Sequence, residues 1–295
     1  MFTSMTDTQK GIFLAIISFT AFSFGDVFMK YLGQFYSPTT IAFFIAAYVL
    51  TFLTILNKKM GGFTATLKTS KWKLHLVRAL CFALEFLLII YGFSNLPMAV
   101  SYALIFLAPF IAPLISIPLL GIKPTRQQWV AIAIGFIGVL IILRPGFVPL
   151  SLPAIGLLIG AFFFAAGNVL VRKIEDGKQT LLSWAFYVEA VTVLITGAVY
   201  VSNPEPVTLS HLAILCGTAA FFMVGLLSIS KAFLLAEPAD AAPFQYIQIL
   251  WGILFGYLIF GDIPDQWTLI GGTVIIGTGI WLVRHQKRPV IKDNL

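Results

Sequence analysis

The chain consists mainly of long apolar segments separated by short stretches that contain Pro, Gly, Asn or charged residues. A helix of about 20 residues crosses the hydrocarbon core of a bilayer. The segments show no sustained alternation of apolar and polar residues, and an open sheet in lipid would leave backbone groups without hydrogen-bond partners. We therefore predict an all-α polytopic membrane protein. Its ten transmembrane helices are expected near residues 11–32, 38–57, 74–94, 97–120, 127–143, 153–173, 180–201, 209–231, 238–260 and 266–284.

Composition strengthens this prediction and excludes several classes of protein. Of the 295 residues, 59% are hydrophobic and only 11% are charged, whereas a soluble domain carries about 25% charge. Ten spans leave too few residues for a soluble catalytic or binding domain. The net charge of +7 does not indicate nucleic-acid binding, because the basic residues lie in short runs between apolar segments. Cys81 and Cys216 lie inside apolar segments without metal-binding spacing, so we expect no metal or other cofactor.

The distribution of basic residues predicts the direction of the helices. If the N-terminus is cytoplasmic, 17 of the 19 Lys and Arg residues fall in cytoplasmic segments, and only Lys30 and Arg144 fall on the other side. Cytoplasmic loops of membrane proteins carry such an excess of positive charge. Both termini are therefore expected in the cytoplasm. One span more or fewer would remove the excess of basic residues on the cytoplasmic side.

Three sequence patterns occur twice in the same order, at a spacing of about 141 residues. The pairs are residues 25–30 (Gly-Asp-Val-Phe-Met-Lys) with 167–172 (Gly-Asn-Val-Leu-Val-Arg), 95–99 with 236–240, and 121–124 (Gly-Ile-Lys-Pro) with 261–264 (Gly-Asp-Ile-Pro). We predict two five-helix repeats, 1–147 and 148–295. Because five is odd, the second repeat must be inverted in the membrane. Convergent placement of Gly and Pro at helix ends is the alternative explanation.

The same patterns resemble the ten-helix EamA-type permeases of the drug/metabolite transporter superfamily. The strongest similarity runs from Arg78 to Gly121 and includes residues 91–101 (Tyr-Gly-Phe-Ser-Asn-Leu-Pro-Met-Ala-Val-Ser). Residues 11–52 and 143–146 look most like the branch that includes S-adenosylmethionine uptake carriers. The resemblance implies a transporter of the bacterial inner membrane that works by alternating access. It also implies a central cavity bounded by the third, fourth, eighth and ninth helices.

Ionisable residues inside the apolar segments are costly in lipid and therefore mark candidate sites. Glu85 lies seven residues after Arg78, on nearly the same helix face and about 10 Å deeper along the axis. We interpret Glu85 as a substrate-binding or proton-coupling residue, and Glu189 as a proton- or ion-coupling residue. For both, the alternative is a carboxyl group that only fixes helix packing. Asp26 and Lys30 are four residues apart, which suggests a local ion pair or the rim of a gate.

The ninth apolar segment contains an unusual group of polar and aromatic residues. Gln245 and Gln248 share a helix face, and Tyr246 and Trp251 lie beside them, so we predict that all four bind substrate. Hydrogen bonding between helices is the alternative role for the amides. Pro243 is a candidate hinge because proline removes a backbone hydrogen bond.

The fourth apolar segment carries an aromatic and proline stripe at helical spacing. We predict that Tyr102 and Phe106 bind substrate and that Pro109 and Pro113 permit bending. Plain packing is the usual role of an aromatic stripe. The match between this segment and the Gln-rich ninth segment favours the binding interpretation.

These features lead us to expect a secondary transporter of a cationic or amphiphilic metabolite such as S-adenosylmethionine. The chain has no Walker-type phosphate loop, so ATP is not expected to drive it. The expected partners are a small-molecule substrate and the lipid bilayer, with a monomer or homodimer as the assembly. Alternatives are an exporter of amino acids or drugs in exchange for protons, a membrane-embedded enzyme, and a channel. Against an enzyme, the three histidines lie near segment ends, where they do not form a nucleophile–base pair with the central residues.

Overall fold

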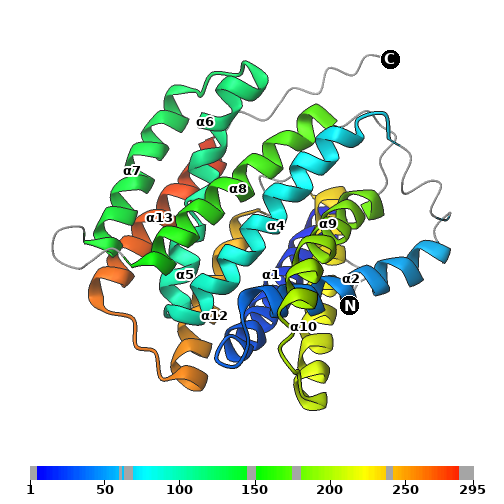
Figure 1. Cartoon of the computed structure of the whole chain (residues 1–295). Helices are drawn as coiled ribbons and strands as arrows, with labels where there is room; N and C mark the ends of the chain where they lie inside the picture. The colour runs from blue at the N-terminus through cyan, green and yellow to red at the C-terminus, as the bar shows by residue number, and fades with distance from the viewer. Residues whose placement is uncertain are drawn as a thin grey trace.

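The computed structural model describes residues 5–59, 62, 69–144, 151–174, 181–236 and 242–285, and these residues form helices without strands (Figure 1). The helices are α1 (Asp7–Leu32), α2 (Pro38–Lys59), α4 (Trp72–Asn95), α5 (Met98–Ile105), α6 (Ala108–Leu120), α7 (Arg126–Leu143), α8 (Leu152–Ile174), α9 (Leu181–Ser202), α10 (Leu209–Leu235), η2 (Ala242–Tyr246), α12 (Ile247–Phe255), η3 (Gly256–Phe260) and α13 (Gln266–His285).

Ten apolar segments account for nearly all of this described structure. Eight are long and apolar enough to cross a membrane, and the segments Phe244–Phe260 and Gln266–Leu282 are shorter apolar helices. Each predicted span agrees with an observed helix within a few residues, except the fourth and the ninth. The prediction of a ten-segment, all-α polytopic membrane protein is confirmed.

The fourth and ninth spans are each broken, whereas we predicted continuous helices. The fourth consists of α5 and α6, separated at Phe106 and Leu107. Pro109 lies at the start of α6, where the missing N–H costs little. The ninth begins with the 3₁₀ turn η2, continues as α12 and ends in the π-helical turn η3. Residues 237–241, which include most of one predicted repeat match, lie outside the described part of the chain.

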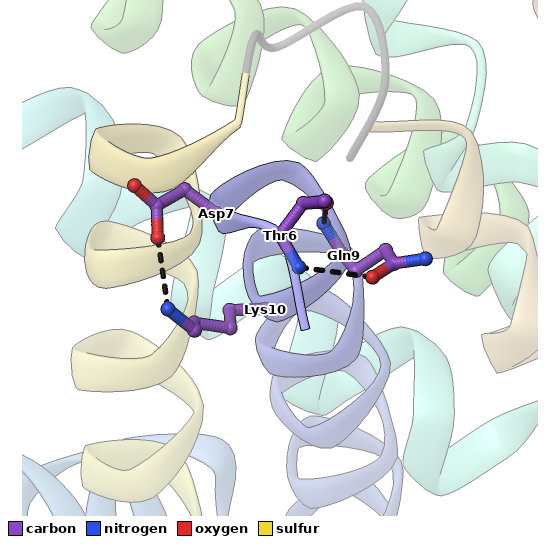
Figure 2. Close-up of polar contacts among 4 residues, drawn as sticks. All are labelled: Thr6, Asp7, Gln9 and Lys10. Atoms are coloured by element: carbon purple, nitrogen blue, oxygen red, sulfur yellow. Dashed lines mark hydrogen bonds and ion pairs between the residues drawn. The ribbon is translucent and has the colours of Figure 1, made fainter. Parts of the chain in front are cut away.

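Helix boundaries are fixed by local hydrogen bonds that the sequence encodes. Figure 2 shows the start of α1, where Thr6 and Gln9 form a reciprocal capping box and Lys10 pairs with Asp7 at 2.9 Å. Such bonds satisfy backbone N–H groups that the first turn leaves unpaired. At their C-terminal ends, α6 and η3 stop at Gly121 and Gly261, both with φ of 70°. This left-handed conformation suits glycine because it has no Cβ.

The helices pack in pairs that join distant parts of the sequence. α1 packs against α10, α4 against α8, α2 against α9, α5 against α12, and α7 against α13. In Figure 1, α7 and α13 lie along one edge, α4 and α8 cross the middle, and α1, α2, α9 and α10 gather at the other edge. The helices of the first half are thus held mainly by helices of the second half, and a cavity lies among them.

Candidate functional site

A cavity of about 350 Å³ lies inside the helix assembly. Its wall comes from α1, α2, α4, α5, α6, α8, α9, α10, η2 and α12. Most of the wall is apolar and contains eight phenylalanine rings, whereas its acidic groups are three carboxyls, one each from α1, α4 and α9. The volume falls in the usual range for small-molecule sites, which combine an apolar wall with a few polar groups.

The three carboxyl groups are those of Asp26, Glu85 and Glu189. Asp26 accepts a hydrogen bond of 2.7 Å from the Tyr102 hydroxyl. Glu85 is only 8% exposed and lies within electrostatic reach of both other carboxyls. Neither Glu85 nor Glu189 forms an ion pair with any described residue. A buried carboxylate without a counterion is unfavourable by several kcal/mol, so Glu85 requires either a proton or a nearby cation.

Helical spacing explains how each carboxyl comes to face the cavity. On α1, Phe19, Phe22 and Asp26 follow one face at three- and four-residue steps, and all three line the cavity. On α4, Phe82 and Glu85 share a cavity-facing side in the same way. Asp26 and Glu85 are therefore each flanked by aromatic rings of their own helix, whereas the α9 neighbours of Glu189 at the cavity are Val188 and Thr192.

Several of the predicted substrate-binding residues meet at this cavity. Tyr102 and Phe106 line it from the fourth span, and Gln245 and Gln248 line it from the ninth. The Tyr102 and Phe106 rings stack with centroids 6.0 Å apart. Tyr102 lies within α5 and Phe106 directly follows it, so their four-residue spacing places both rings on the same side.

Two other predicted binding residues pack outside the cavity. The Tyr246 ring packs edge-on against Phe106 at 5.3 Å, and its hydroxyl occupies the space that a Cβ at Gly279 would need. The Trp251 indole donates a hydrogen bond of 3.1 Å to the Thr20 hydroxyl. Both side chains therefore position neighbouring helices rather than line the cavity wall.

Lys30 forms a different contact from the local pair with Asp26 that we predicted. Its ammonium group donates to the carbonyl oxygens of Phe93 at 3.2 Å and Leu96 at 2.6 Å, and lies 3.5 Å from the Asp262 carboxylate. It also lies over the Phe260 ring. Lys30 thus ties the end of α1 to the ends of α4 and η3, at the end of the molecule where Asp26 lies.

The predicted hinge prolines take three different positions. Pro109 lines the cavity at the start of α6, and Pro113 lies inside α6 without lining it. Pro243 belongs to η2, and the structure describes only its backbone.

Sequence reasoning missed most of the aromatic wall. Phe19, Phe22, Phe82, Phe86, Phe93, Phe164 and Phe222 line the cavity, but Phe is abundant throughout the chain and an aromatic side chain is usually a packing residue. For Phe19, Phe22 and Phe82 the available signal was the helix face that each shares with an acid, whereas Phe164 and Phe222 lie on helices without an acidic residue. Thr192, one turn after Glu189, was missed although the same argument applies to it.

Residues 9–144 match the EamA-like transporter family. An S-adenosylmethionine uptake transporter of Rickettsia prowazekii is 26% identical over 97% of this chain and 98% of its own length. A pseudopaline exporter of Pseudomonas aeruginosa is 24% identical over 95% of this chain and 98% of its own length. A riboflavin transporter of Vibrio cholerae is 24% identical over 88% of both chains.

A solved crystal structure has the same fold. It aligns with a TM-score of 0.64 over 94% of this chain and 99% of the other, at 12% sequence identity. The ten apolar segments, the family match over the first half and the full-length similarity to named transporters agree with one another. This chain is a multi-pass membrane transporter whose first half, residues 9–144, matches the EamA-like transporter family and whose full length is similar to named small-molecule transporters.

Proposed function

We propose that the chain is a secondary transporter that carries a small organic cation, with S-adenosylmethionine as the first candidate. The observation that carries this proposal is the cavity with three carboxyl groups, of which the deeply buried Glu85 has no counterion among the described residues. A cationic substrate supplies the missing charge. The S-adenosylmethionine uptake transporters of Rickettsia, similar over nearly the whole chain, support this choice.

Alternating access is the transport mechanism we propose, with two inverted five-helix repeats, 1–147 and 148–295. Helix pairing supports it: α1 with α10 and α4 with α8 both join a first helix of one half to a third helix of the other. The pairs α2–α9, α5–α12 and α7–α13 join equivalent helices. Gly121 and Gly261, equivalent in the repeat, share the same backbone conformation. Two halves related in this way exchange conformations around a central site.

We also propose that the protein lies in the inner membrane with both termini in the cytoplasm. The bias of 17 of the 19 basic residues toward that side supports the orientation. Cysteine labelling of the loops between α1 and α2 and between α6 and α7 tests it. The first loop should react with an impermeant reagent from the periplasm and the second should not. The reverse pattern contradicts the proposal.

The transport proposal is tested with purified protein in liposomes. Vesicles that contain the protein should take up radiolabelled S-adenosylmethionine with saturable kinetics, and unlabelled substrate inside the vesicles should accelerate uptake by exchange. Vesicles with Glu85→Gln protein serve as the matched control. Uptake equal to that of protein-free vesicles, across S-adenosylmethionine, amino acids and other organic cations, contradicts the proposal.

Export in exchange for protons is the second candidate, because the buried Glu85 and the half-buried Glu189 are carboxyls of the cavity wall able to bind a proton when no cation occupies the cavity. A relative named as a pseudopaline exporter matches the chain over 95% of its length. A pH gradient should then drive accumulation, and Glu85→Gln should abolish that accumulation while exchange continues. Unchanged pH dependence in the variant removes Glu85 from proton coupling.

A further inference from the structure

The ionisable groups of the cavity wall are all acidic among the described residues. Three of its lining residues carry a carboxyl group, and none of the described residues that line it is Lys, Arg or His. The remaining polar groups are neutral: the amides of Gln245 and Gln248 and the hydroxyls of Tyr102 and Thr192. The wall therefore offers several acceptors for a cation but no counterion for an anion.

A positive charge inside this cavity meets two favourable environments. The Glu85 carboxyl is more than nine-tenths buried and faces the cavity without an ion pair or hydrogen bond to the described residues. Electrostatic attraction to it is stronger there than in water, because the surroundings are poorly polarisable. The phenylalanine rings of the wall add the negative faces of their π systems, to which quaternary ammonium and similar cations bind.

A carboxylate on the substrate meets the opposite conditions. It loses its hydration on entering the cavity and is repelled by the acids of the wall. The nearest arginine to the wall along α4 is Arg78, which does not line the cavity and already has carbonyl and aromatic partners, although its Nε has no hydrogen-bond partner among the described residues. Its guanidinium donates to the Trp184 carbonyl oxygen at 2.9 Å and lies 4.6 Å from the Phe82 ring centroid and 5.0 Å from that of Trp184. Phe82 lines the cavity, and the Arg78 guanidinium packs against its ring.

We propose that the cavity prefers organic cations that carry an aromatic group and no carboxylate over the same cations with a carboxylate attached. The inference rests on the proposed function, because it names the chemistry of the substrate that the transporter carries. Positive charge and aromatic surface are recognised by the wall, whereas an α-carboxylate is tolerated at a loss of affinity. S-Adenosylmethionine would then bind through its sulfonium and adenine groups, and its carboxylate would weaken the complex.

Binding of two matched ligand pairs to the full-length protein in detergent tests this preference. The first pair is S-adenosylmethionine and its decarboxylated form, and the second is phenylalanine betaine and phenethyltrimethylammonium. Each pair differs by one carboxylate, and the second pair does not depend on adenosine recognition. Isothermal titration calorimetry should give a dissociation constant about tenfold lower for the ligand without the carboxylate in both pairs.

Two variants show which group causes the preference. Glu85→Gln should reduce the ratio of dissociation constants within each pair toward one, because the main repulsive charge is removed. Glu205→Gln, outside the cavity wall, should leave the ratio unchanged. Arg78→Gln should also leave it unchanged. Weaker binding of only the carboxylated ligands to Arg78→Gln overturns the proposal, because it would identify Arg78 as a carboxylate site.

Equal or tighter binding of the carboxylated ligands in both pairs overturns the inference, as does a failure of all four ligands to bind. Flux measurements separate this result from failure of the proposed function. If the preferred cations bind but do not cross liposome membranes, the transport proposal fails and the inference stands. If both members of a pair are transported and the carboxylated one binds more tightly, transport stands and the inference fails.

Discussion

Two buried charged residues within membrane spans have opposite surroundings. Lys30 is 7% exposed and has two carbonyl oxygens and the Asp262 carboxylate around its ammonium group. Glu85 is 8% exposed and has no ion pair with any described residue. A buried charge with partners holds elements together, whereas one without partners is costly unless a ligand or proton completes it. The contrast separates a charge that ties helices together from one that the proposed transport cycle would use.

The contrast extends to the positions that match Lys30 and Asp262 in the proposed repeat. These are Arg172 and Ile122, and both are exposed. Isoleucine carries no charge, so Arg172 has no acidic partner at position 122.

The largest effect is expected when Glu85 is replaced by Gln. Uptake of the cationic substrate should fall by about 100-fold, because a charge-assisted contact contributes about 1.5–3 kcal/mol. The free energy of unfolding should stay the same or rise, since an unpaired buried charge is removed. Uptake assays and thermal unfolding in detergent measure the two quantities. Normal uptake combined with a lower melting temperature would assign Glu85 to packing.

Replacing Lys30 with Met should lower the free energy of unfolding, in contrast to the replacement of Glu85. The variant loses the contacts to Phe93, Leu96 and Asp262 and should be destabilised by about 2–3 kcal/mol, at the low end for breaking a buried pair because Asp262 is partly exposed. Thermal unfolding checks this value. The double variant with Asp262→Asn should be destabilised by less than the sum of the single changes. Additive effects would show that the ion pair contributes nothing.

Tyr102→Phe removes the hydrogen bond to Asp26 and should have a smaller effect on binding. The loss of a hydrogen bond to a carboxyl group is worth about 1 kcal/mol, which corresponds to about a fivefold increase in the dissociation constant of the cation. The ring is retained, so its stacking with Phe106 should persist. Titration calorimetry gives the shift, and a variant that binds as the parent does would remove this bond from substrate recognition.

The exposed pair of Arg144 and Asp265 should give the smallest effect. Hydrogen bonds from the Thr268 hydroxyl and backbone N–H, helped by Arg144, hold the pKa of Asp265 below its usual range against the opposing effect of burial. Its contribution to stability is therefore present above the ordinary pKa of an aspartate and is lost as the pH falls through the lowered value. Arg144→Gln should cost at most about 0.5 kcal/mol near neutral pH, because exposed pairs are screened by solvent.

Stability measured against pH tests this last prediction. The difference between the parent and Arg144→Gln should disappear in acid, where Asp265 is protonated in both proteins. A difference that persists unchanged in acid would mean that Arg144 acts through packing.

The sequence predicts the helices of this protein better than its contacts. Long apolar segments identify all ten spans, because the membrane sets their length. Glu85 can be recognised as a candidate site residue because a carboxyl in an apolar helix needs a partner, and it does line the cavity. The meeting of Glu85 with Asp26 and Glu189 cannot be read from local spacing, since it depends on how three helices pack. Lys30 illustrates the same limit: its partner four residues away is plausible on the helix surface, but the observed partner is Asp262.

The fit between Tyr246 and Gly279 has an evolutionary consequence. The phenol oxygen fills the volume where any side chain at position 279 would begin. A change at 279 to alanine is therefore compatible with the native packing only when the phenol has already been exchanged for a shorter group. Among natural homologues these two positions should covary, with bulk at one site accompanied by its loss at the other.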